Sequence, residues 1–289
     1  MIRIGIDALG GDNGETPVVD AIIKSLETNN DISITIIGNK DKIEECFNNR
    51  MYNYNSDKII IVNASEKIEM NDHPVLAIRS KTDSSICIAG KLLLNNNIDI
   101  FISAGNTGAL VALALFNLKT IEGVNRPVVA TIIPSKNNPA VLIDSGCNVD
   151  SKPEWLYQFA ILGAKYYELV FNKKSPKVGL LSVGTEENKG NQLTLEAYKL
   201  IKENSNINFI GNIEARDAIN GVCDVVVADG FAGNVLLKTY EASAKLILSS
   251  LKKVLMNNIF TKIAAILVKN DIKNELKKFD IKIYGKTTW

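Results

Sequence analysis

Short runs of hydrophobic residues, rich in Ile and Val, alternate along the chain with longer segments in which apolar residues recur at helical spacing. Such runs are typical of buried strands, and their alternation with helices indicates βαβ units around a parallel sheet. The sequence therefore predicts an α/β fold with a mostly parallel, doubly wound sheet, in a single domain over residues 1–289. The expected strands are Ile2–Ile6, Ser33–Ile37, Lys58–Val62, Ile98–Ser103, Val128–Ile133, Ala140–Ile143, Lys177–Val183, Asn208–Gly211 and Asp224–Ala228.

Several of the expected helices have recognisable first residues. Thr16-Pro17 combines a capping residue with proline at the first helical position, where a missing N–H does no harm. Other helices are expected to begin near Thr107, at Lys152-Pro153 and near Val235. Asp72-His73-Pro74 also has the form of a helix start.

The C-terminal third has a different pattern. Apolar residues recur at helical spacing from Val235 to about Leu255, Asn257-Asn258 interrupts them, and a second apolar segment covers Ile259–Val268. This pattern predicts a helical hairpin subdomain over about residues 240–280 that projects from the sheet. No apolar run approaches the roughly 18 residues that indicate a transmembrane helix.

Charge is distributed unevenly along the chain. The net charge is only +1, which gives no indication of a nucleic-acid partner, but the segment from Lys245 onward has ten lysines and three acidic residues. We therefore expect a basic C-terminal face. The four cysteines are scattered without a CxxC pair, which favours reduced thiols and a cytoplasmic protein.

The candidate chemistry lies in polar, glycine-containing segments that follow five of the predicted strands. Ligands of open α/β sheets bind beyond the carboxyl ends of the strands, so we expect these segments to line one crevice. Glycine permits close approach of the backbone, and N–H groups at a helix start favour an anion. A tight turn explains any single segment, whereas the set indicates a phosphate site. Its candidate residues are Asp7, Gly10, Gly11, Asp12, Ser103, Gly105, Asn106, Thr107, Asn148, Thr185, Asn191 and Gly233.

The sequence excludes several familiar kinds of site. It contains neither the G-x-G spacing of the dinucleotide fingerprint nor the GxxxxGK[ST] pattern of P-loop enzymes. The single histidine, His73, and the dispersed cysteines offer no zinc ligand cluster. One histidine is weak support for a Ser–His or Cys–His nucleophile, so we interpret His73 as structural or surface-exposed. No cofactor and no metal are expected.

These exclusions leave chemistry that requires no histidine, cofactor or metal. Direct attack by inorganic phosphate meets this condition, because phosphate is largely dianionic near neutral pH and needs little help from a general base. The protein then has to orient and desolvate phosphate and to stabilise the oxyanion that forms.

Six segments resemble, in order, the motifs of the PlsX-type phosphate acyltransferases of bacterial phospholipid synthesis. The resemblance extends from Ile2 to about Tyr284, and six ordered motifs are far more specific than one glycine-containing loop. The segments are Ile6–Asp12, Ser103–Ala109, Asp150–Glu154, Val183–Glu186 with Lys189–Asn191, Gly211–Asp217 and Asp229–Asn234.

The resemblance implies transfer of a fatty acyl group from acyl carrier protein to inorganic phosphate, giving an acyl phosphate that a glycerol-3-phosphate acyltransferase consumes. It also implies a three-layer αβα fold related to isopropylmalate dehydrogenases and phosphotransacetylases, a homodimer, and peripheral attachment at the inner face of the cell membrane. Two other functions stay open: a phosphotransacetylase acting on acyl-CoA, and a truncated, inactive chain that serves as a binding protein. The long apolar hairpin favours a fatty-acyl or membrane-facing substrate.

Carried over residue by residue, the resemblance gives Lys189 and Asn234 catalytic roles. A lysine can neutralise the phosphate or the thioester oxyanion as a point charge, and an asparagine amide at a helix start can donate to the same oxygen. The ordinary alternatives are a solvated loop lysine and a helix N-cap. The resemblance also suggests contacts with phosphate or with the carrier's phosphopantetheine, against the alternative of an exposed helix face, for Arg79, Lys81, Ser84, Ser85 and Arg216.

The tip of the predicted hairpin, residues 256–267, combines apolar side chains with flanking lysines. Apolar anchors among cations suit an anionic membrane interface. The same lysines suit an acidic carrier protein, and the apolar residues equally suit the interface of a dimer.

Members of this family continue past the position of Tyr284-Gly285 with a further strand, a loop and a closing helix, whereas here four residues follow Gly285. Phe279–Gly285 has the pattern of an approach to another strand, and a last strand without a successor leaves ladder groups and apolar surface uncovered. We therefore expect a truncation or frameshift, and a chain that dimerises weakly and has low activity.

Overall fold

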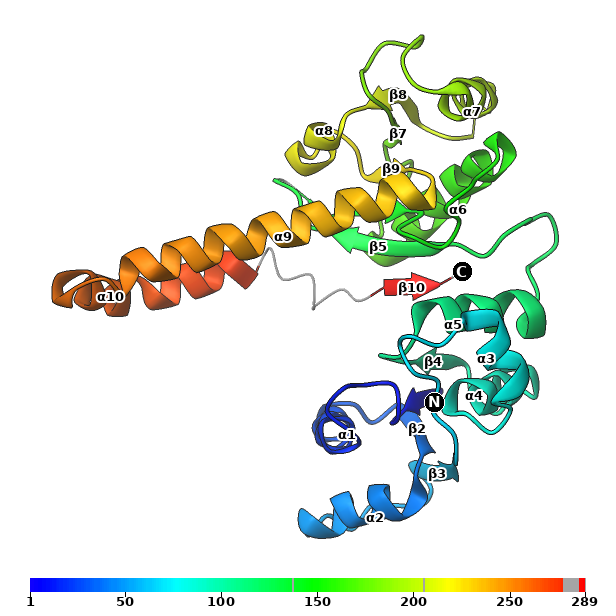
Figure 1. Cartoon of the computed structure of the whole chain (residues 1–289), viewed down its shortest axis with the longest axis vertical. Helices are drawn as coiled ribbons and strands as arrows, with labels where there is room; N and C mark the ends of the chain where they lie inside the picture. Colours follow the sequence, from blue (N-terminus) through cyan, green and yellow to red (C-terminus); the bar gives the residue numbers. More distant parts are fainter. Residues whose placement is uncertain (137, 205, 278–285, 289) are drawn as a thin grey trace. The chain divides into compact units, whose positions relative to one another are not determined.

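The computed structural model describes residues 1–136, 138–204, 206–277 and 286–288 (Figure 1). The chain forms two compact units, Met1–Gly123 and Val124–Trp289, and each contains its own sheet. Both sheets are mostly parallel and have helices packed on both faces, so the predicted α/β fold is confirmed. That the whole chain acts as a single domain stays a prediction.

The first unit is a parallel sheet of strand order β3-β2-β1-β4. Successive side chains of its second strand pack on opposite faces, since Ile34 and Ile36 contact the two N-terminal helices and Ile37 contacts α4. Its elements are β1 (Ile2–Asp7), α1 (Thr16–Thr28), β2 (Ile32–Gly38), α2 (Lys40–Asn49), β3 (Ile59–Asn63), α3 (Pro74–Ser80), α4 (Ser85–Leu94), β4 (Ile100–Ile102), α5 (Thr107–Leu113) and the π-helical turn η1 (Ala114–Leu118).

The second unit is a mixed sheet of strand order β10-β5-β6-β9-β7-β8, in which β5 is antiparallel to both neighbours. Its central strand is buried on both faces: Val225 and Val227 pack with α6, whereas Val226 packs with α8 and α9. Its elements are β5 (Val129–Ile133), β6 (Ala140–Ile143), α6 (Pro153–Phe171), β7 (Val178–Leu181), α7 (Gln192–Lys202), β8 (Phe209–Ile213), α8 (Ala215–Asn220), β9 (Val225–Val227), α9 (Gly230–Leu255), α10 (Ile259–Lys277) and β10 (Lys286–Thr288).

Every strand predicted from the sequence is present, with ends that differ by about two residues or fewer. Two helix starts differ from the prediction. Helix α1 already includes Thr16 and its N-cap is Glu15, which makes no side-chain capping bond. Helix α9 begins at Gly230 rather than near Val235, because Asp229 caps it. The expected approach to a further strand at Phe279–Gly285 lies outside the described residues.

The predicted hairpin is formed by α9 and α10, which lie side by side (Figure 1). Asn258 starts the second helix: its side chain accepts a hydrogen bond from Thr261 N–H at 3.0 Å, and Thr261 Oγ1 accepts one from Asn258 N–H at 3.1 Å. Many apolar side chains near the turn are exposed, among them Phe260 at 80% and Leu267 at 76%. Among the described helices, none is long and apolar enough to cross a membrane.

Helix α6 allows a matched test of the core. Leu156 is fully buried and Leu169 is 75% exposed on the same helix. We expect Leu156→Ala to lower the free energy of unfolding by about 2–5 kcal/mol, and Leu169→Ala to change it by about 0.5 kcal/mol or less. Urea unfolding followed by circular dichroism measures both. Equal losses in the two variants would contradict this packing of α6.

Candidate active site

Polar loops gather at one edge of each sheet. In the second unit β6, β9 and β7 are adjacent and parallel. Their carboxyl ends, followed by residues 144–148, 229–234 and 182–191, therefore meet at one edge. In the first unit β1 and β4 are adjacent and parallel, and residues 8–13 and 103–108 follow them.

Asp7, the last residue of β1, joins the two loops of the first unit. Its carboxylate is buried and accepts hydrogen bonds from the N–H groups of Leu9 and Gly10 at 2.9 and 3.0 Å. The hydroxyl of Ser103 donates to the other carboxylate oxygen at 2.6 Å and accepts from Gly105 N–H at 3.0 Å. A Cβ atom on Gly10 would lie 2.7 Å from Gly105 N, so only glycine permits this contact.

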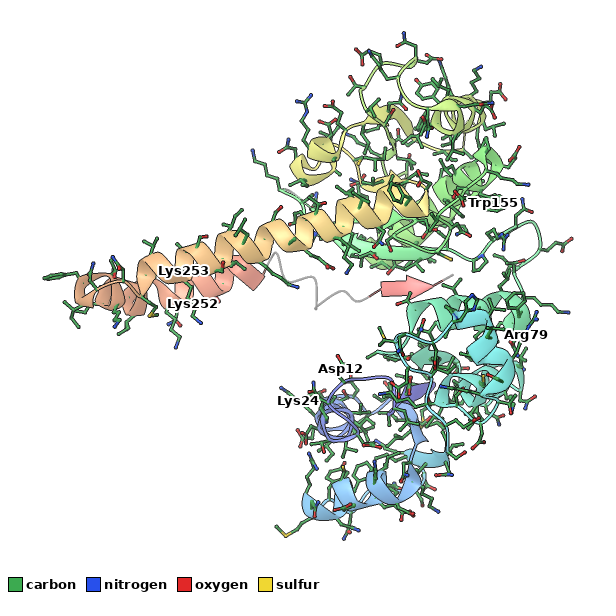
Figure 2. All side chains as sticks on the ribbon, viewed as in Figure 1. Asp12, Lys24, Arg79, Trp155, Lys252 and Lys253 are labelled. Carbon is green, nitrogen blue, oxygen red and sulfur yellow. The ribbon has the colours of Figure 1, made fainter. Side chains whose placement is uncertain are left out.

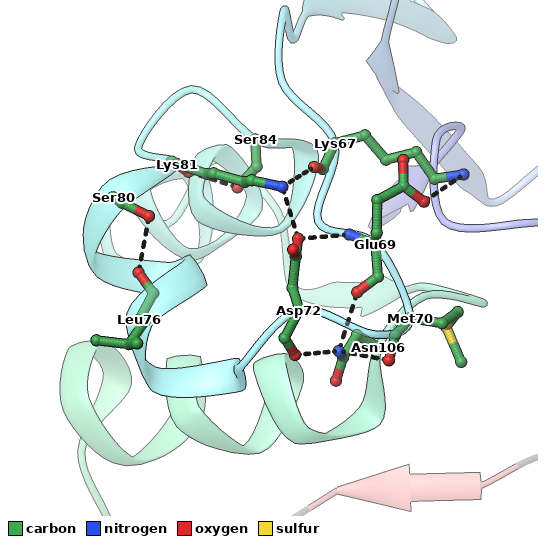
Figure 3. A network of polar contacts seen from close by, with 9 residues as sticks. All are labelled: Lys67, Glu69, Met70, Asp72, Leu76, Ser80, Lys81, Ser84 and Asn106. Atoms are coloured by element: carbon green, nitrogen blue, oxygen red, sulfur yellow. Dashed lines mark hydrogen bonds and ion pairs between the residues drawn. The ribbon is translucent and has the colours of Figure 1, made fainter.

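Asn106 fixes the start of α5 and a neighbouring segment at the same time (Figure 3). Its Oδ1 accepts from Ala109 N–H at 3.1 Å, which caps the helix. Its Nδ2 donates to the carbonyls of Glu69, Met70 and Asp72 at 3.1, 3.3 and 3.3 Å. The buried amide thus has internal partners on both of its atoms.

Lys81 and Ser84 belong to the same network (Figure 3). Lys81 Nζ donates to Asp72 Oδ2 at 2.6 Å and to the carbonyl of Lys67 at 2.9 Å. This ammonium group lowers the pKa of Asp72 through the side-chain hydrogen bond. Ser84 is the N-cap of α4, and its Oγ donates to the carbonyl of Lys81 at 2.7 Å. Both side chains therefore hold the fold of the first unit together.

The other predicted residues of the first unit take separate places. Arg79, which Figure 2 labels, is exposed. Its guanidinium lies 5.7 Å from the centre of the Phe116 ring. Ser85 is buried in the first turn of α4. The remainder are exposed or border open space, namely His73, Asp12, Thr107 and Gly11.

In the second unit, residues 144–148 wrap around the carboxylate of Asp144. This residue is fully buried. It accepts from the N–H groups of Gly146, Cys147 and Asn148 at 3.0, 2.9 and 2.7 Å, and from Asn148 Nδ2 at 2.9 Å. Of this loop, only Asn148 is among the candidate residues predicted from the sequence. Asp144 is not, although an aspartate directly after a buried strand and before Ser-Gly is a signal for such a turn.

The first turn of α9 lies directly on this loop. A Cβ atom on Gly233 would be 1.9 Å from the carbonyl oxygen of Asp144, and Gly230 N–H donates to the carbonyl of Asn148 at 2.8 Å. Any side chain at position 233 would therefore force the helix away from the loop.

Asn234 is the next residue of α9 and lies over Gly146, because a Cβ atom built on Gly146 would be 3.4 Å from Asn234 Cγ. The N-cap of α9 is Asp229, whose carboxylate accepts from Phe231 and Ala232 N–H at 3.0 and 2.9 Å. The N-cap alternative for Asn234 is therefore wrong. The Asn234 side chain is exposed, and no residue that the structure describes hydrogen bonds to it, so its amide is available.

Lys189 lies in the loop between β7 and α7. Its N–H donates to the carbonyl of Glu186 at 3.0 Å, and its own carbonyl accepts from Ser182 Oγ at 3.1 Å. The side chain is exposed and has no ion-pair partner within the described part of the chain. Its stem lies against Gly184, where a Cβ atom would be 3.0 Å from Lys189 Cγ. The backbone of the loop is thus fixed, while the ammonium group is available.

The remaining predicted residues of the second unit are placed as follows. Asn191 caps α7, because its Oδ1 accepts from Thr194 N–H at 2.9 Å. Thr185 is exposed. Arg216 is paired with the Glu214 carboxylate, as an ion pair rather than an aligned hydrogen bond, since Glu214 Oε2 has no hydrogen-bond partner among the described residues.

The loops satisfy many of their own backbone N–H groups. Asp7, Asp144 and Asp229 each accept from two or more amides of the loop or helix turn that follows them. These amides are consequently occupied by the protein's own carboxylates. In the second unit, the available groups at the sheet edge are side chains, chiefly Lys189 and Asn234.

Cys147 lies within this edge but is a poor nucleophile. Burial raises its pKa to about 12, and the neighbouring Asp144 carboxylate contributes in the same direction. Its Sγ lies 3.2 Å from the carbonyl of Pro127, to which it donates. The thiolate, which is the reactive form, is therefore almost absent near neutral pH. Across the described residues, no three His, Cys, Asp or Glu side chains gather as metal ligands would.

The fold is similar to that of solved phosphotransacetylases, which are α/β proteins. A phosphotransacetylase from Streptococcus pyogenes matches with a TM-score of 0.62 and 17% identity, over 86% of this chain and 82% of that chain. At this identity the likeness establishes the fold alone.

Sequence relationships are closer. Residues 2–289 match the family described as "Fatty acid synthesis protein". A phosphate acyltransferase from Clostridium botulinum is 46% identical over 98% of this chain and 85% of its own length. One from Bacillus subtilis is 44% identical over 98% of this chain and 84% of its own length. The chain belongs to the family described as "Fatty acid synthesis protein". Its relatives are phosphate acyltransferases, as the resemblance of the six segments indicated.

The raised pKa of Cys147 gives a direct prediction. At pH 7.5 we expect iodoacetamide to alkylate Cys147 roughly 10³-fold more slowly than an exposed thiol, because so little of it is thiolate. The rate should keep rising with pH far above 9, since the pKa is about 12. Peptide mass spectrometry of timed samples measures the rate, and the urea-unfolded chain provides the reference. Rapid labelling of the folded protein at pH 7.5 would contradict the burial of this thiol.

Proposed function

We propose that this protein transfers a fatty acyl group from acyl carrier protein to inorganic phosphate, and so forms an acyl phosphate. Membership in the fatty acid synthesis family supports the proposal. The relatives from Clostridium botulinum and Bacillus subtilis, which are both named phosphate acyltransferase, support it as well. The main structural support for the proposal is the position of two polar side chains at the edge of the second sheet. There Lys189, in the loop after β7, and Asn234, near the start of the helix after β9, present an ammonium group and an amide that have no partner among the described residues.

The proposed chemistry is a single acyl transfer. A phosphate oxygen attacks the thioester carbonyl, the new C–O bond forms as the C–S bond breaks, and the carrier's thiol leaves with the proton that phosphate loses. Lys189 neutralises charge on phosphate or on the carbonyl oxygen, and Asn234 donates to that oxygen. The proposed step involves no covalent intermediate on Cys147, because burial raises the pKa of this thiol to about 12 and so disfavours the thiolate at neutral pH.

Replacing the proposed groups tests their roles. We expect Lys189→Ala and Asn234→Ala each to raise the activation barrier by about 2.7–4 kcal/mol, as the loss of one oxyanion donor does. Both side chains are exposed, so the thermal unfolding midpoint should not change. The measurement is phosphate-dependent loss of the acyl-carrier-protein thioester together with appearance of acyl phosphate.

Lys199→Ala is the control, because Lys199 is an exposed lysine on the neighbouring helix α7. The Lys199→Ala variant should form acyl phosphate at the same rate as the unaltered protein. Near-normal turnover in Lys189→Ala or Asn234→Ala would remove that residue from the mechanism. Consumption of short acyl-CoA but not of the carrier thioester would favour a phosphotransacetylase, and activity on neither would favour a binding protein.

We also propose that the protein acts in the cytoplasm as a homodimer and contacts the inner face of the membrane through the hairpin. Apolar Phe260, Ile263 and Leu267 are exposed near the turn between α9 and α10. Lys252 and Lys253, which Figure 2 labels on α9, and Lys262 are exposed nearby. Apolar anchors among cations suit an anionic lipid surface. The membrane position would deliver acyl phosphate to a glycerol-3-phosphate acyltransferase.

Vesicle binding tests the hairpin. We expect the protein to co-sediment with vesicles containing phosphatidylglycerol, less at high salt, and expect Phe260→Asp combined with Ile263→Asp to abolish binding. Leu169→Asp combined with Val170→Asp changes exposed apolar residues on α6 and should leave binding intact. If the hairpin change instead separates a dimer without affecting vesicle binding, this segment is a dimer interface.

A further inference from the structure

The position of Lys189 depends on a side chain from the next strand. Asn212 lies near the end of β8, and its Nδ2 donates to the carbonyl of Glu186 at 2.8 Å and, over a longer distance, to the carbonyl of Lys189 at 3.4 Å. The turn that carries Lys189 is therefore held from β8 and, through Ser182, from the end of β7.

A bulge in β8 puts Asn212 in this position. Val178 pairs with Phe209, but the next pair is Gly179 with Gly211, so one residue of β8 is left over and Gly211 has a φ of 95°. The shift places Asn212, rather than Gly211, opposite Leu180. Bulges of this kind redirect a side chain and are over-represented beside active sites.

Asn212 lowers the stability of the fold, because its buried side chain contains a polar atom without a partner among the described residues. It is 5% exposed, and its Oδ1 has no hydrogen-bond partner among the residues that the structure describes. A buried polar atom without a partner costs about 1–3 kcal/mol. The reverse orientation of the amide would place its oxygen against two carbonyl oxygens, so the nitrogen has to face the loop. An apolar residue of the same size would avoid the cost of the unpaired oxygen but could not hold the turn.

We infer that Asn212 is a positioning residue that fixes Lys189 for the reaction, an inference that rests on the proposed function. A lysine on a loop has many conformations, and a misplacement of about 1 Å costs up to roughly 100-fold in rate. Asn212 restricts the backbone beneath Lys189, and Gly184 leaves room for the stem of its side chain.

Asn212→Leu is the principal test. Leucine has a similar size and removes the donor together with the unpaired oxygen, while the carbonyls of Glu186 and Lys189 keep their hydrogen bonds from Lys189 N–H and from Ser182 Oγ. We expect kcat/KM for phosphate to fall roughly 10- to 100-fold, with no decrease in the thermal unfolding midpoint. A purely structural role would instead lower the midpoint and leave the rate per folded molecule unchanged. Asn208→Leu, which removes a similar bond to the carbonyl of Ser175, is the control and should retain full activity.

A double-mutant cycle shows whether Asn212 acts through Lys189. In a Lys189→Ala background we expect Asn212→Leu to change the rate by no more than about twofold, because the residue it positions is gone. Equal effects in both backgrounds, or full activity of Asn212→Leu in the presence of Lys189, would overturn the inference and leave the proposed function standing. Near-normal activity of Lys189→Ala would overturn both. If Asn212→Leu does not fold, Asn212→Ala, which removes the same donor with a smaller side chain, enters the same cycle with the same expected outcomes.

Discussion

The carboxylate of Asp144 accepts four hydrogen bonds from the three residues 146–148, and the loops of this protein depend on interactions of this kind. Asp7 and Asp229 do the same for the loop or helix turn that follows them. Beyond the end of a strand, backbone N–H groups no longer have a carbonyl partner on the neighbouring strand. The carboxylate of an aspartate at this position accepts their hydrogen bonds instead. The backbone of these loops is consequently fixed by the protein's own carboxylates, and the proposed function assigns ligand recognition to side chains such as Lys189 and Asn234, which have no partner among the described residues.

The sequence predicts the strands well because each is a short β-branched run buried between helices, and in such strands local pattern and burial agree. Val225–Val227 is the clearest example, with alternate residues in two different cores. The start of α9 was missed because Gly230 and Gly233 look like loop residues. These two glycines instead allow the helix to pack closely against residues 144–148. This contact is between distant parts of the sequence, so the residues around the glycines do not reveal it.

The candidate site is less accessible to sequence reasoning. Polar, glycine-containing segments indicate where a ligand binds, but only the family motifs single out Lys189 and Asn234. Asp144 and Asn212 were not among the candidate residues. The role of Asp144 is visible only in the loop that closes around its carboxylate. The role of Asn212 depends on a bulge in β8 that turns its side chain toward another loop. Conversely, Lys81 and Ser84 look like ligand contacts in sequence, whereas in the fold they pair with Asp72, with Lys67 and with each other.

The length of α9 has a mechanical consequence. The helix has 26 residues, which at 1.5 Å per residue makes a rod about 39 Å long. Asn234 is its fifth residue, Lys252 and Lys253 lie in its last turn, and the helix is continuous between them. The first turn cannot rock freely, because Gly233 is pressed against the carbonyl of Asp144. A torque applied to the far end of this lever therefore has to bend the helix or be transmitted to the sheet edge that carries Asn234.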